Sequence, residues 1–403
     1  MKQFTRTIIA LFALCLTACQ GKMETPEMVM YENPAAASSQ GSFRSEETEA
    51  TVSRGEFLLR QDVLVPEQLA EIGLTWPRAI RYADENSFYL YGFDREKQRE
   101  GNFLATLARY DTTTQGLTVI FQDYASTDYT ERMSVDKINE TTELIFTGQA
   151  VCQVENGRMT DYMPLSKELL RDPAFNAATK TIAYATQDTL ELCLFEVTSS
   201  QSVSIYQPPL DENGSVAGMT SLPALSADGQ AVLFQKTGLT ASLFQSLTAC
   251  DRAGKVLLET SPLERLSDSL YHAWLKDGFY TMQATDSSAD TDTGNASYIT
   301  RYDATGKQTD TWMLECCIDT QQISSPRNTT ISYTIIWTDL SEGIRTGIGV
   351  LDFSTGSATR QYTATGTVHA QDLSPSGKKL AWIEDTSVFE GAVNQGETIM
   401  AHR

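Results

Sequence analysis

A short apolar run recurs seven times along the chain, each time after a polar turn. The runs are rich in aromatic and β-branched residues and too short for typical helices, so they predict strands. Their apolar residues do not alternate strictly with polar ones, which is typical of strands buried on both faces. The runs begin roughly 40–55 residues apart and cover residues 86–91, 142–146, 180–184, 230–234, 278–282, 331–337 and 379–383.

Most runs are followed by a second strand, a turn and a further strand. The second strand often ends in Asp, with a Gly three to five residues later, as at Asp111, Asp251, Asp303 and Asp352. An Asp side chain can bond to its own backbone and Gly accepts a positive φ, so this spacing indicates hairpins. Four-stranded antiparallel units at this period predict an all-β fold, the β-propeller.

The number of runs predicts seven blades, with six or eight as alternatives because the unit at about 126–165 is weakly patterned. The last unit supplies strands at 371–374, 379–384 and 397–402 and then lacks a fourth. The strand-like segment 55–65 precedes the first unit. We predict that this N-terminal strand pairs with the last blade and closes the ring, because closure removes an exposed sheet edge.

The N-terminus has the layout of a secretory signal peptide. Lys2 and Arg6 precede an apolar run over 8–16, which is too short to span a membrane. Residues 16–19, Leu-Thr-Ala-Cys, resemble the lipobox of bacterial lipoproteins, which implies cleavage after residue 18 and a diacylglyceride on Cys19. Two acyl chains are enough for stable anchoring to the cell membrane or outer membrane. An ordinary cleaved signal with a chance Cys is the alternative.

The chain therefore divides into a signal peptide (1–18), a lipidated Cys with a tether (19–54) and a propeller (55–403). The tether has no apolar period and is rich in Pro, Ala, Ser and Glu, so it cannot bury enough surface to fold. A flexible chain of this length spans about 30–35 Å. Propellers of the remaining length fold as a single domain.

Two of the units carry a recognisable repeat. Residues 225–234, Leu-Ser-Ala-Asp-Gly-Gln-Ala-Val-Leu-Phe, and 373–382, Leu-Ser-Pro-Ser-Gly-Lys-Lys-Leu-Ala-Trp, resemble the WD40-like PD40 repeat of TolB-type propellers. The family signature is Ser-Pro-Asp-Gly-Lys, and this chain departs from it at Ala227 and Ser376. The resemblance covers most of 70–403 by period but only two blades by residue. It implies a propeller whose loops bind a protein or peptide partner, without identifying that partner.

Composition narrows the classes of partner. The formal net charge is −21, from 52 acidic and 31 basic residues. This balance argues against nucleic acid and against anionic lipid headgroups as ligands.

The cysteines outside the signal peptide and lipobox do not indicate a disulfide framework or a zinc site. The odd set Cys152, Cys193, Cys250, Cys316 and Cys317 defines no disulfide framework and no zinc spacing. The adjacent Cys316 and Cys317 either form a vicinal disulfide or, as we prefer, are simply two small buried residues.

The histidines do not indicate a catalytic group. His369 lies near Asp372 and Ser374, but strand geometry would separate their side chains. We expect His272 to be a hydrogen-bonded blade residue. We assign no catalytic residue and no cofactor.

For three further features we prefer a purely structural interpretation. The loop with Asp286, Asp290 and Asp292 offers oxygen ligands for calcium, but a solvated hairpin tip is preferred because no Glu closes the set. The mixed-charge loop 94–100 is expected to be solvated. The five tryptophans are expected to pack inside blades rather than form a carbohydrate platform.

The leading hypothesis for function is a membrane-anchored, extracytoplasmic binding or scaffold module. The first alternative is a hydrolase or lyase whose residues converge on the channel mouth from several blades, which linear spacing cannot reveal. The second alternative is a sensor or assembly partner of an envelope machine. Fold alone does not decide between them.

Overall fold

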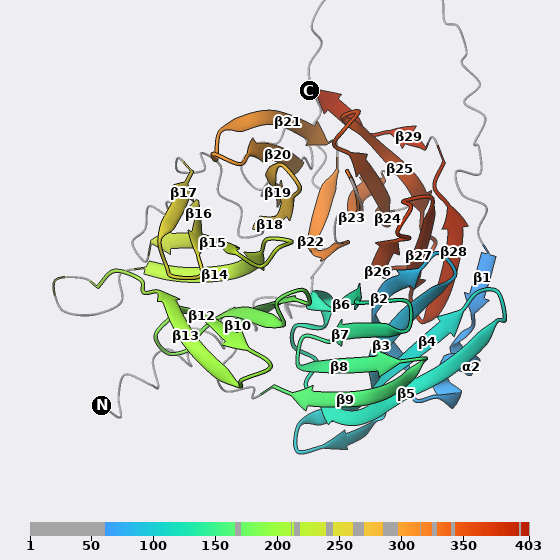
Figure 1. The fold of residues 1–403 in the computed structure, drawn as a ribbon. Helices are drawn as coiled ribbons and strands as arrows, with labels where there is room; N and C mark the ends of the chain where they lie inside the picture. The colour runs from blue at the N-terminus through green and yellow to red at the C-terminus, as the bar shows by residue number, and fades with distance from the viewer. Residues whose placement is uncertain are drawn as a thin grey trace, which may run out of the picture. The chain divides into compact units, whose positions relative to one another are not determined.

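The computed structural model describes residues 61–165, 171–210, 212, 218–238, 245–260, 270–284, 297–314, 316–324, 329–339, 343–394 and 396–402. Within these ranges, seven antiparallel sheets lie around a common centre, so the fold is a seven-bladed β-propeller (Figure 1). The predicted fold class and blade number are confirmed, and the weakly patterned unit forms blade 2. None of the helices in the described ranges is long and apolar enough to cross a membrane.

In blades 1 to 6 the first strand of each blade lies nearest the centre and the fourth lies outside (Figure 1). Blades 1 to 4 consist of β2 (Trp76–Asp84), β3 (Ser87–Arg99), β4 (Asn102–Asp111) and β5 (Gly116–Ala125); β6 (Ser134–Lys137), β7 (Thr142–Phe146), β8 (Ala150–Glu155) and β9 (Arg158–Pro164); β10 (Arg171–Asn176), β11 (Thr181–Ala185), β12 (Leu192–Glu196) and β13 (Gln201–Tyr206); and β14 (Gly218–Leu225), β15 (Ala231–Gly238), β16 (Gln245–Asp251) and β17 (Val256–Glu259).

Blade 7 takes its outer strand from the other end of the chain. Blades 5 to 7 consist of β18 (Leu270–Leu275), β19 (Gly278–Ala284), β20 (Ser297–Asp303) and β21 (Gln308–Leu314); β22 (Cys317–Ile323), β23 (Thr330–Asp339), β24 (Gly343–Asp352) and β25 (Ser357–Thr363); and β26 (Val368–Leu373), β27 (Lys379–Glu384), β28 (Ser387–Ala392) and β1 (Gln61–Leu64).

The predicted closure by an N-terminal strand is confirmed. β1 pairs antiparallel with β28, with Asp62 opposite Phe389 and Leu64 opposite Val388. Residues 55–60 of the predicted closing segment lie outside the described ranges. One chain end thus completes a sheet built by the other, which removes the free edge of β28.

The predicted third strand of blade 7 was wrong. That strand is β28, because the chain turns back directly after β27 through a two-residue loop in which Asp385 has φ +53°. Residues 397–402 instead form β29 (Glu397–Thr398), which pairs with β25, and β30 (Met400–His402), which pairs with β21. The C-terminal strap, as we call residues 396–402, therefore gives blades 5 and 6 a fifth strand.

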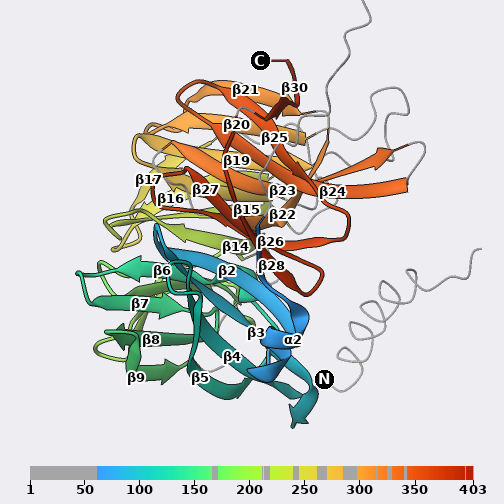
Figure 2. The same ribbon diagram turned by 90° about the vertical axis from the view of Figure 1, so that its right-hand side faces the viewer.

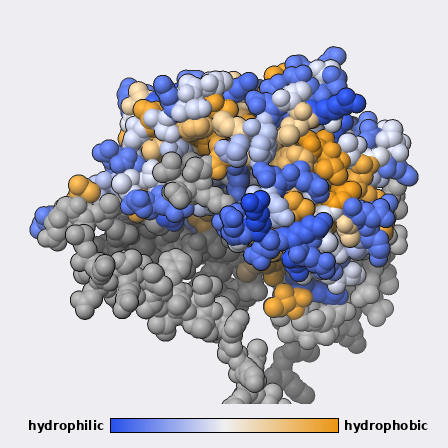
Figure 3. All heavy atoms as spheres, turned by 90° about the horizontal axis from the view of Figure 1, so that it is seen from below, coloured by the Kyte–Doolittle hydropathy of each residue, from blue (hydrophilic) through white to orange (hydrophobic). Residues whose placement is uncertain are grey.

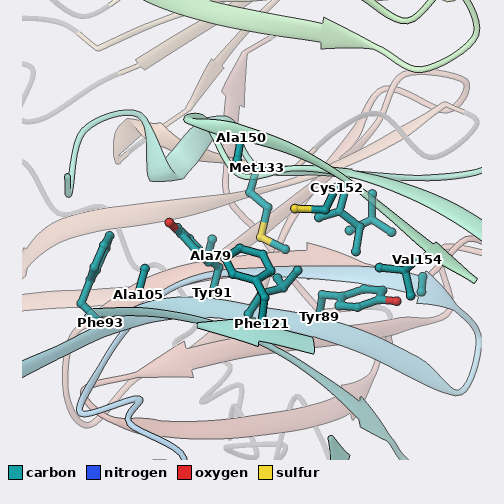
Figure 4. Close-up of a cluster of buried hydrophobic side chains, with 14 residues drawn as sticks. Ala79, Tyr89, Tyr91, Phe93, Ala105, Phe121, Met133, Ala150, Cys152 and Val154 are labelled. Carbon is teal, nitrogen blue, oxygen red and sulfur yellow. The ribbon is translucent and has the colours of Figure 1, made fainter. Parts of the chain in front are cut away.

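The seven apolar runs are the second strands of the blades, and both their faces are buried. Phe88 and Leu90 pack in the hydrophobic cluster between blades 7 and 1, whereas Tyr89 and Tyr91 pack in the cluster between blades 1 and 2 (Figure 4). Side chains alternate along a strand, so successive residues reach opposite neighbours. Each of the seven hydrophobic clusters of the described core joins one pair of adjacent blades.

Two short helical segments were not predicted, because neither is long enough to show a helical period. α2 (Pro66–Glu71) leads from β1 towards β2 on the outside of the ring, beside blade 1 (Figures 1 and 2). Pro66 suits the first helical turn, and Gln68 Oε1 accepts a hydrogen bond from the Val65 amide. Leu69 is buried between blades 7 and 1. The 3-10 helix η2 (Thr130–Arg132) precedes β6.

The outer strands expose a few apolar side chains, including the neighbouring pair Val256 and Leu257 on β17. Val119 on β5, Met159 on β9 and Val203 on β13 are at least 39% exposed. Figure 3 views the side on which β5 and β9 lie in Figure 1, and its hydrophobic groups are separated by hydrophilic ones. Scattered apolar residues of this kind are normal for a protein surface.

Candidate functional site

The inner strands β2, β6, β10, β14, β18, β22 and β26 surround the centre of the ring (Figure 1). We call the end at which these strands begin the top face. The hairpin between the second and third strands of a blade lies at the same end, because Trp76 at the start of β2 pairs with Phe93 late in β3.

A cavity of about 330 Å³ lies in the centre of the ring. Blades 1 to 6 all contribute to its wall, through Arg81, Ser134, Phe175, Leu225, His272 and Ile323 among others. The inner strands of blades 2 and 3 have 4 and 6 residues, against 9 in blade 1. The residues that precede β6 and those that open β10 line the cavity.

Arg81 joins three blades at the wall of this cavity. Its guanidinium donates to the carbonyl oxygens of Met133 at 2.8 Å, Glu131 at 3.0 Å and Gln371 at 3.4 Å, and to that of Ile80. The side chain is buried, with 7% exposure. Five N–H groups in a fixed fork allow one Arg to satisfy several buried carbonyls. The primary role of Arg81 is therefore to fix the positions of blades 7, 1 and 2.

η2 places Glu131 and Arg132 at the same cavity. Tyr129, which precedes η2, has φ +60°, and its carbonyl oxygen would lie 2.1 Å from a Cβ at Gly148. A glycine is therefore required for this close approach. Arg132 Nε lies 4.0 Å from Glu131 Oε1, too far for a hydrogen bond, and this nitrogen is buried without a hydrogen-bond partner among the described residues.

Blades 3 and 4 carry the same backbone distortion beside the cavity. Asp172 and Leu222 have φ +51° and +52°, and each precedes a proline at an irregularity of its inner strand. Positive φ is costly for a residue with a bulky side chain, and such strain is often found at functional sites. Asp172 Oδ2 accepts a 3.4 Å hydrogen bond from the Leu222 amide and lies 3.7 Å from Arg171 Nε.

His272 of β18 is the least hydrated ionisable group in the wall. It is 3% exposed, and neither ring nitrogen has a hydrogen-bond partner of normal geometry in the described part of the chain. Burial lowers the pKa of His272 to about 4, and the positive charge of Arg132 contributes to this shift. The ring is therefore neutral at pH 7, with one nitrogen able to donate and the other able to accept. The expected blade location is observed, and the ring makes weak hydrogen bonds to the backbone of Leu233 and Leu222, outside normal geometry.

The other predicted site residues lie elsewhere. Cys19 and the acidic loop with Asp286, Asp290 and Asp292 are outside the described ranges. Within those ranges, no group of three or more His, Cys, Asp or Glu residues is arranged to hold a metal ion. Cys316 is buried and Cys317 half-buried.

His369, Asp372 and Ser374 do not come together as a catalytic group. Asp372 Oδ2 accepts a hydrogen bond from the Tyr82 amide, and Ser374 Oγ lies 3.3 Å from Ser376 Oγ. His369 is half-buried, and burial lowers its pKa, with a further contribution from Arg78. Trp312 and Trp382 are fully buried, as expected of blade packing, whereas Trp76, Trp274 and Trp337 are half-buried.

Sequence analysis missed most of the cavity because its wall comes from six inner strands spread over the chain. Of these residues only His272 had been considered. The available signal was the polar content of the segments just before the apolar runs, such as Arg81 before the first and Asp172 before the third. These residues face a cavity, so they follow no apolar period.

Comparisons with known proteins agree with the architecture. No protein-family model and no curated protein matches the sequence. Among solved structures, the β-propeller domain of Cps50 (Swd1) from Myceliophteria thermophila is 11% identical, with a TM-score of 0.52, covering 79% of this chain and 97% of that one. An oligogalacturonate lyase from Vibrio parahaemolyticus is 9% identical, with a TM-score of 0.50, covering 79% and 98%. At these identities the likeness shows the β-propeller fold alone.

Proposed function

We propose that the chain is a binding module that takes a segment of a protein or peptide partner into its central cavity from the top face. The observation that carries this proposal is the convergence of six inner strands on one cavity of about 330 Å³. That volume is at the lower end of the range for ligand pockets. A rigid ring holds the wall in place, so little ordering entropy is lost on binding.

The chemistry of the wall suits a ligand with a polar group and an apolar body. Arg132 Nε is a buried nitrogen without a hydrogen-bond partner among the described residues, and the buried ring of His272 makes only weak hydrogen bonds to the backbone of Leu222 and Leu233. Leu222, Pro223 and Leu270 supply apolar surface nearby. Buried polar groups without partners are costly, and a ligand that bonds to them recovers that cost.

The binding test compares two tryptophan variants of the chain from residue 20 onward as baits in envelope extract. Ala224→Trp fills the cavity, because Ala224 is part of its wall. Ser199→Trp places the same ring on an exposed turn between β12 and β13, at the opposite end of the blade. We expect a partner recovered with the wild-type and S199W baits to be lost with A224W. Equal recovery with A224W, at an unchanged melting temperature, would contradict the proposal.

We propose further that the mature protein is exported and lipid-anchored through Cys19. Support comes from the sequence, in which a positive start and an apolar run precede Leu-Thr-Ala-Cys. The tether of residues 19–54 would then separate the propeller from the membrane. Labelling cells with radioactive palmitate tests this, since full-length protein should carry label and Cys19→Ala should not. An unlabelled wild-type protein would refute the anchor.

A hydrolase or lyase is the second candidate, because Arg132, Asp172 and His272 line one cavity. A Ser-His-Asp-type hydrolase needs a histidine that is hydrogen-bonded to a nucleophile and oriented by an acid. Among the described residues, His272 has no such hydrogen bond, and Asp172 is engaged with Arg171 and the Leu222 amide. This geometry favours binding over turnover. Hydrolysis of a substrate panel that is lost in His272→Gln would reverse that preference.

A further inference from the structure

The top face of blade 1 carries two arginines on one tryptophan. The guanidinium carbons of Arg95 and Arg78 lie 4.5 Å and 5.0 Å from the ring centroid of Trp76. Trp76 itself packs on Phe93 and Phe103, with ring centroids 6.1 Å and 6.2 Å away. Both guanidinium groups are within the distance at which a cation is attracted to an aromatic face.

The backbone holds this arrangement in place. The Arg95 amide donates a 3.0 Å hydrogen bond to Thr75 Oγ1, which ties the β3–β4 hairpin to the chain just before Trp76. Arg78 belongs to β2, the inner strand of the same blade. The three side chains therefore come from two paired strands, β2 and β3, and form a preorganised group that we call the arginine clamp.

The arginine clamp lacks the carboxylate partners that Arg252, Arg301 and Arg360 have. Within the described ranges, neither Arg78 nor Arg95 has a carboxylate oxygen within 4.0 Å, and Arg78 Nε is buried without a hydrogen-bond partner. Asp94, beside Arg95 in sequence, pairs with Lys97 at 3.0 Å. The comparable stack of Arg360 on Trp337, at 4.8 Å, is neutralised by an ion pair with Glu397.

The positive charges of Arg78 and Arg95 also act on His369 of blade 7. Burial lowers the pKa of His369, and the charges of Arg78 and Arg95 lower it further. Asp385 is the carboxylate close enough to oppose this effect, and one of its oxygens already accepts a hydrogen bond from the Thr367 amide. Near His369, the positive charges of Arg78 and Arg95 therefore outnumber the negative charge of Asp385, which already accepts a hydrogen bond.

We infer that the arginine clamp of Trp76, Arg78 and Arg95 is a docking site for a short carboxylate-rich segment of a partner polypeptide. A guanidinium that is stacked on an aromatic ring keeps its N–H edge available, and this edge matches a carboxylate in two parallel hydrogen bonds. Two such groups fit two neighbouring acidic side chains. None of the three clamp residues lines the central cavity, so the clamp is a separate site.

A polypeptide fits this site better than a nucleic acid or an anionic membrane. The chain carries a net charge of −21, which repels long polyanions and extended anionic surfaces. A clamp of two charges can attract a short segment locally, because repulsion from more distant charges is screened within about 8–10 Å at ordinary salt. The partner is thus expected to be acidic only where it touches the clamp.

Fluorescence anisotropy with fluorescein-labelled hexaglutamate tests the clamp on the chain from residue 20 onward. We expect binding at about 100 mM salt, where repulsion from distant charges is already screened, and weaker binding at about 500 mM. Arg95→Gln and Arg78→Gln should each weaken it by about fivefold or more, as expected for loss of one charge-assisted contact. Arg99→Gln is the matched control, because Arg99 is 70% exposed on the same hairpin and outside the clamp.

Three outcomes would overturn the assignment. The first is the absence of hexaglutamate binding at about 100 mM salt. The second is an equal loss in R99Q and R95Q, which would mean attraction to the hairpin as a whole. The third is equal or tighter binding of labelled hexathymidylate with the same arginine dependence, which would make the clamp a phosphate site. A cavity-filled A224W chain should bind hexaglutamate like wild type, so failure of the cavity proposal leaves this test intact.

Discussion

The Tyr82 amide donates a 2.8 Å hydrogen bond to Asp372 Oδ2, and these residues are 290 positions apart in the chain. Tyr82 belongs to β2 of blade 1 and Asp372 to β26 of blade 7, so this bond crosses the seam at which the ring closes. The Tyr82 hydroxyl also donates to Glu390 Oε1 at 2.8 Å. The seam thus combines a shared outer strand, a hydrophobic cluster and buried hydrogen bonds.

Replacing Asp372 should weaken the seam. The side chain is 0% exposed, so Asp372→Ala leaves a buried amide without its acceptor and should lower the free energy of unfolding by about 2–4 kcal/mol. Asp372→Asn keeps an acceptor oxygen and should cost less. Urea unfolding measures both, with Asp188→Ala on an exposed loop as the control expected within about 0.5 kcal/mol of wild type. If Asp372→Ala were as stable as Asp188→Ala, the hydrogen bond from the Tyr82 amide would contribute nothing to stability.

The closing strand should be stabilising through one buried side chain. Leu64 of β1 is 2% exposed in the cluster between blades 7 and 1, whereas Val65 next to it is 41% exposed. Leu64→Ala should cost about 2–4 kcal/mol through lost burial and a residual cavity, and Val65→Ala should cost under about 1 kcal/mol. Thermal unfolding of both variants checks the difference. Equal melting temperatures would argue that β1 does not hold the ring closed in solution.

The parts of the fold that the sequence predicted are those with a local physical cause. The second strands were found because each is buried on both faces, as Phe88 and Tyr89 show by reaching different neighbouring blades. Closure was predicted from the cost of an unpaired edge on the last blade and a strand-like segment before the first. Neither inference needed the position of any individual side chain in space.

The parts that were missed depend on long-range arrangement. Residues 397–402 do form strands, but nothing local indicates that they pair with β25 and β21 instead of β27. Arg132 and His272 meet at the cavity from blades 2 and 5, which no linear spacing encodes. The positive φ of Asp172 was hidden for another reason, since such a conformation is normally marked by Gly.

Removal of the C-terminal strap should expose two sheet edges at once. Ile399 packs half-buried against the cluster between blades 5 and 6, and β29 and β30 cover β25 and β21. A chain ending at residue 395 should lose about 1–3 kcal/mol of stability and self-associate through the freed edges. Size-exclusion chromatography with light scattering detects the association. Glu397→Gln, which removes only the exposed ion pair with Arg360, should remain monomeric and within about 1 kcal/mol of wild type.

His272 should make stability depend on pH. Its folded pKa is about 4, below its ordinary value of 6.5, because burial and Arg132 disfavour the charged ring. The unfolded state therefore binds the proton first. The contribution of the neutral ring is fully present above about pH 7, falls as the pH drops from 6.5 towards 4, and is lost below that. The difference in pKa corresponds to a maximal loss on the order of 3 kcal/mol.

His272→Gln isolates this contribution, because glutamine is neutral at every pH in the range and of similar size. Urea unfolding of both proteins at pH 7.5, 6, 5 and 4 separates the histidine from the carboxylates, which titrate alike in the two chains. The stability of the wild type relative to H272Q should fall steadily with decreasing pH. A difference that stays constant across the series would mean that the ring titrates equally in both states and is hydrated in the folded protein. Saturation with a cavity ligand that accepts a hydrogen bond from the ring should raise the folded pKa and shrink this pH dependence, which links the titration to occupancy of the cavity.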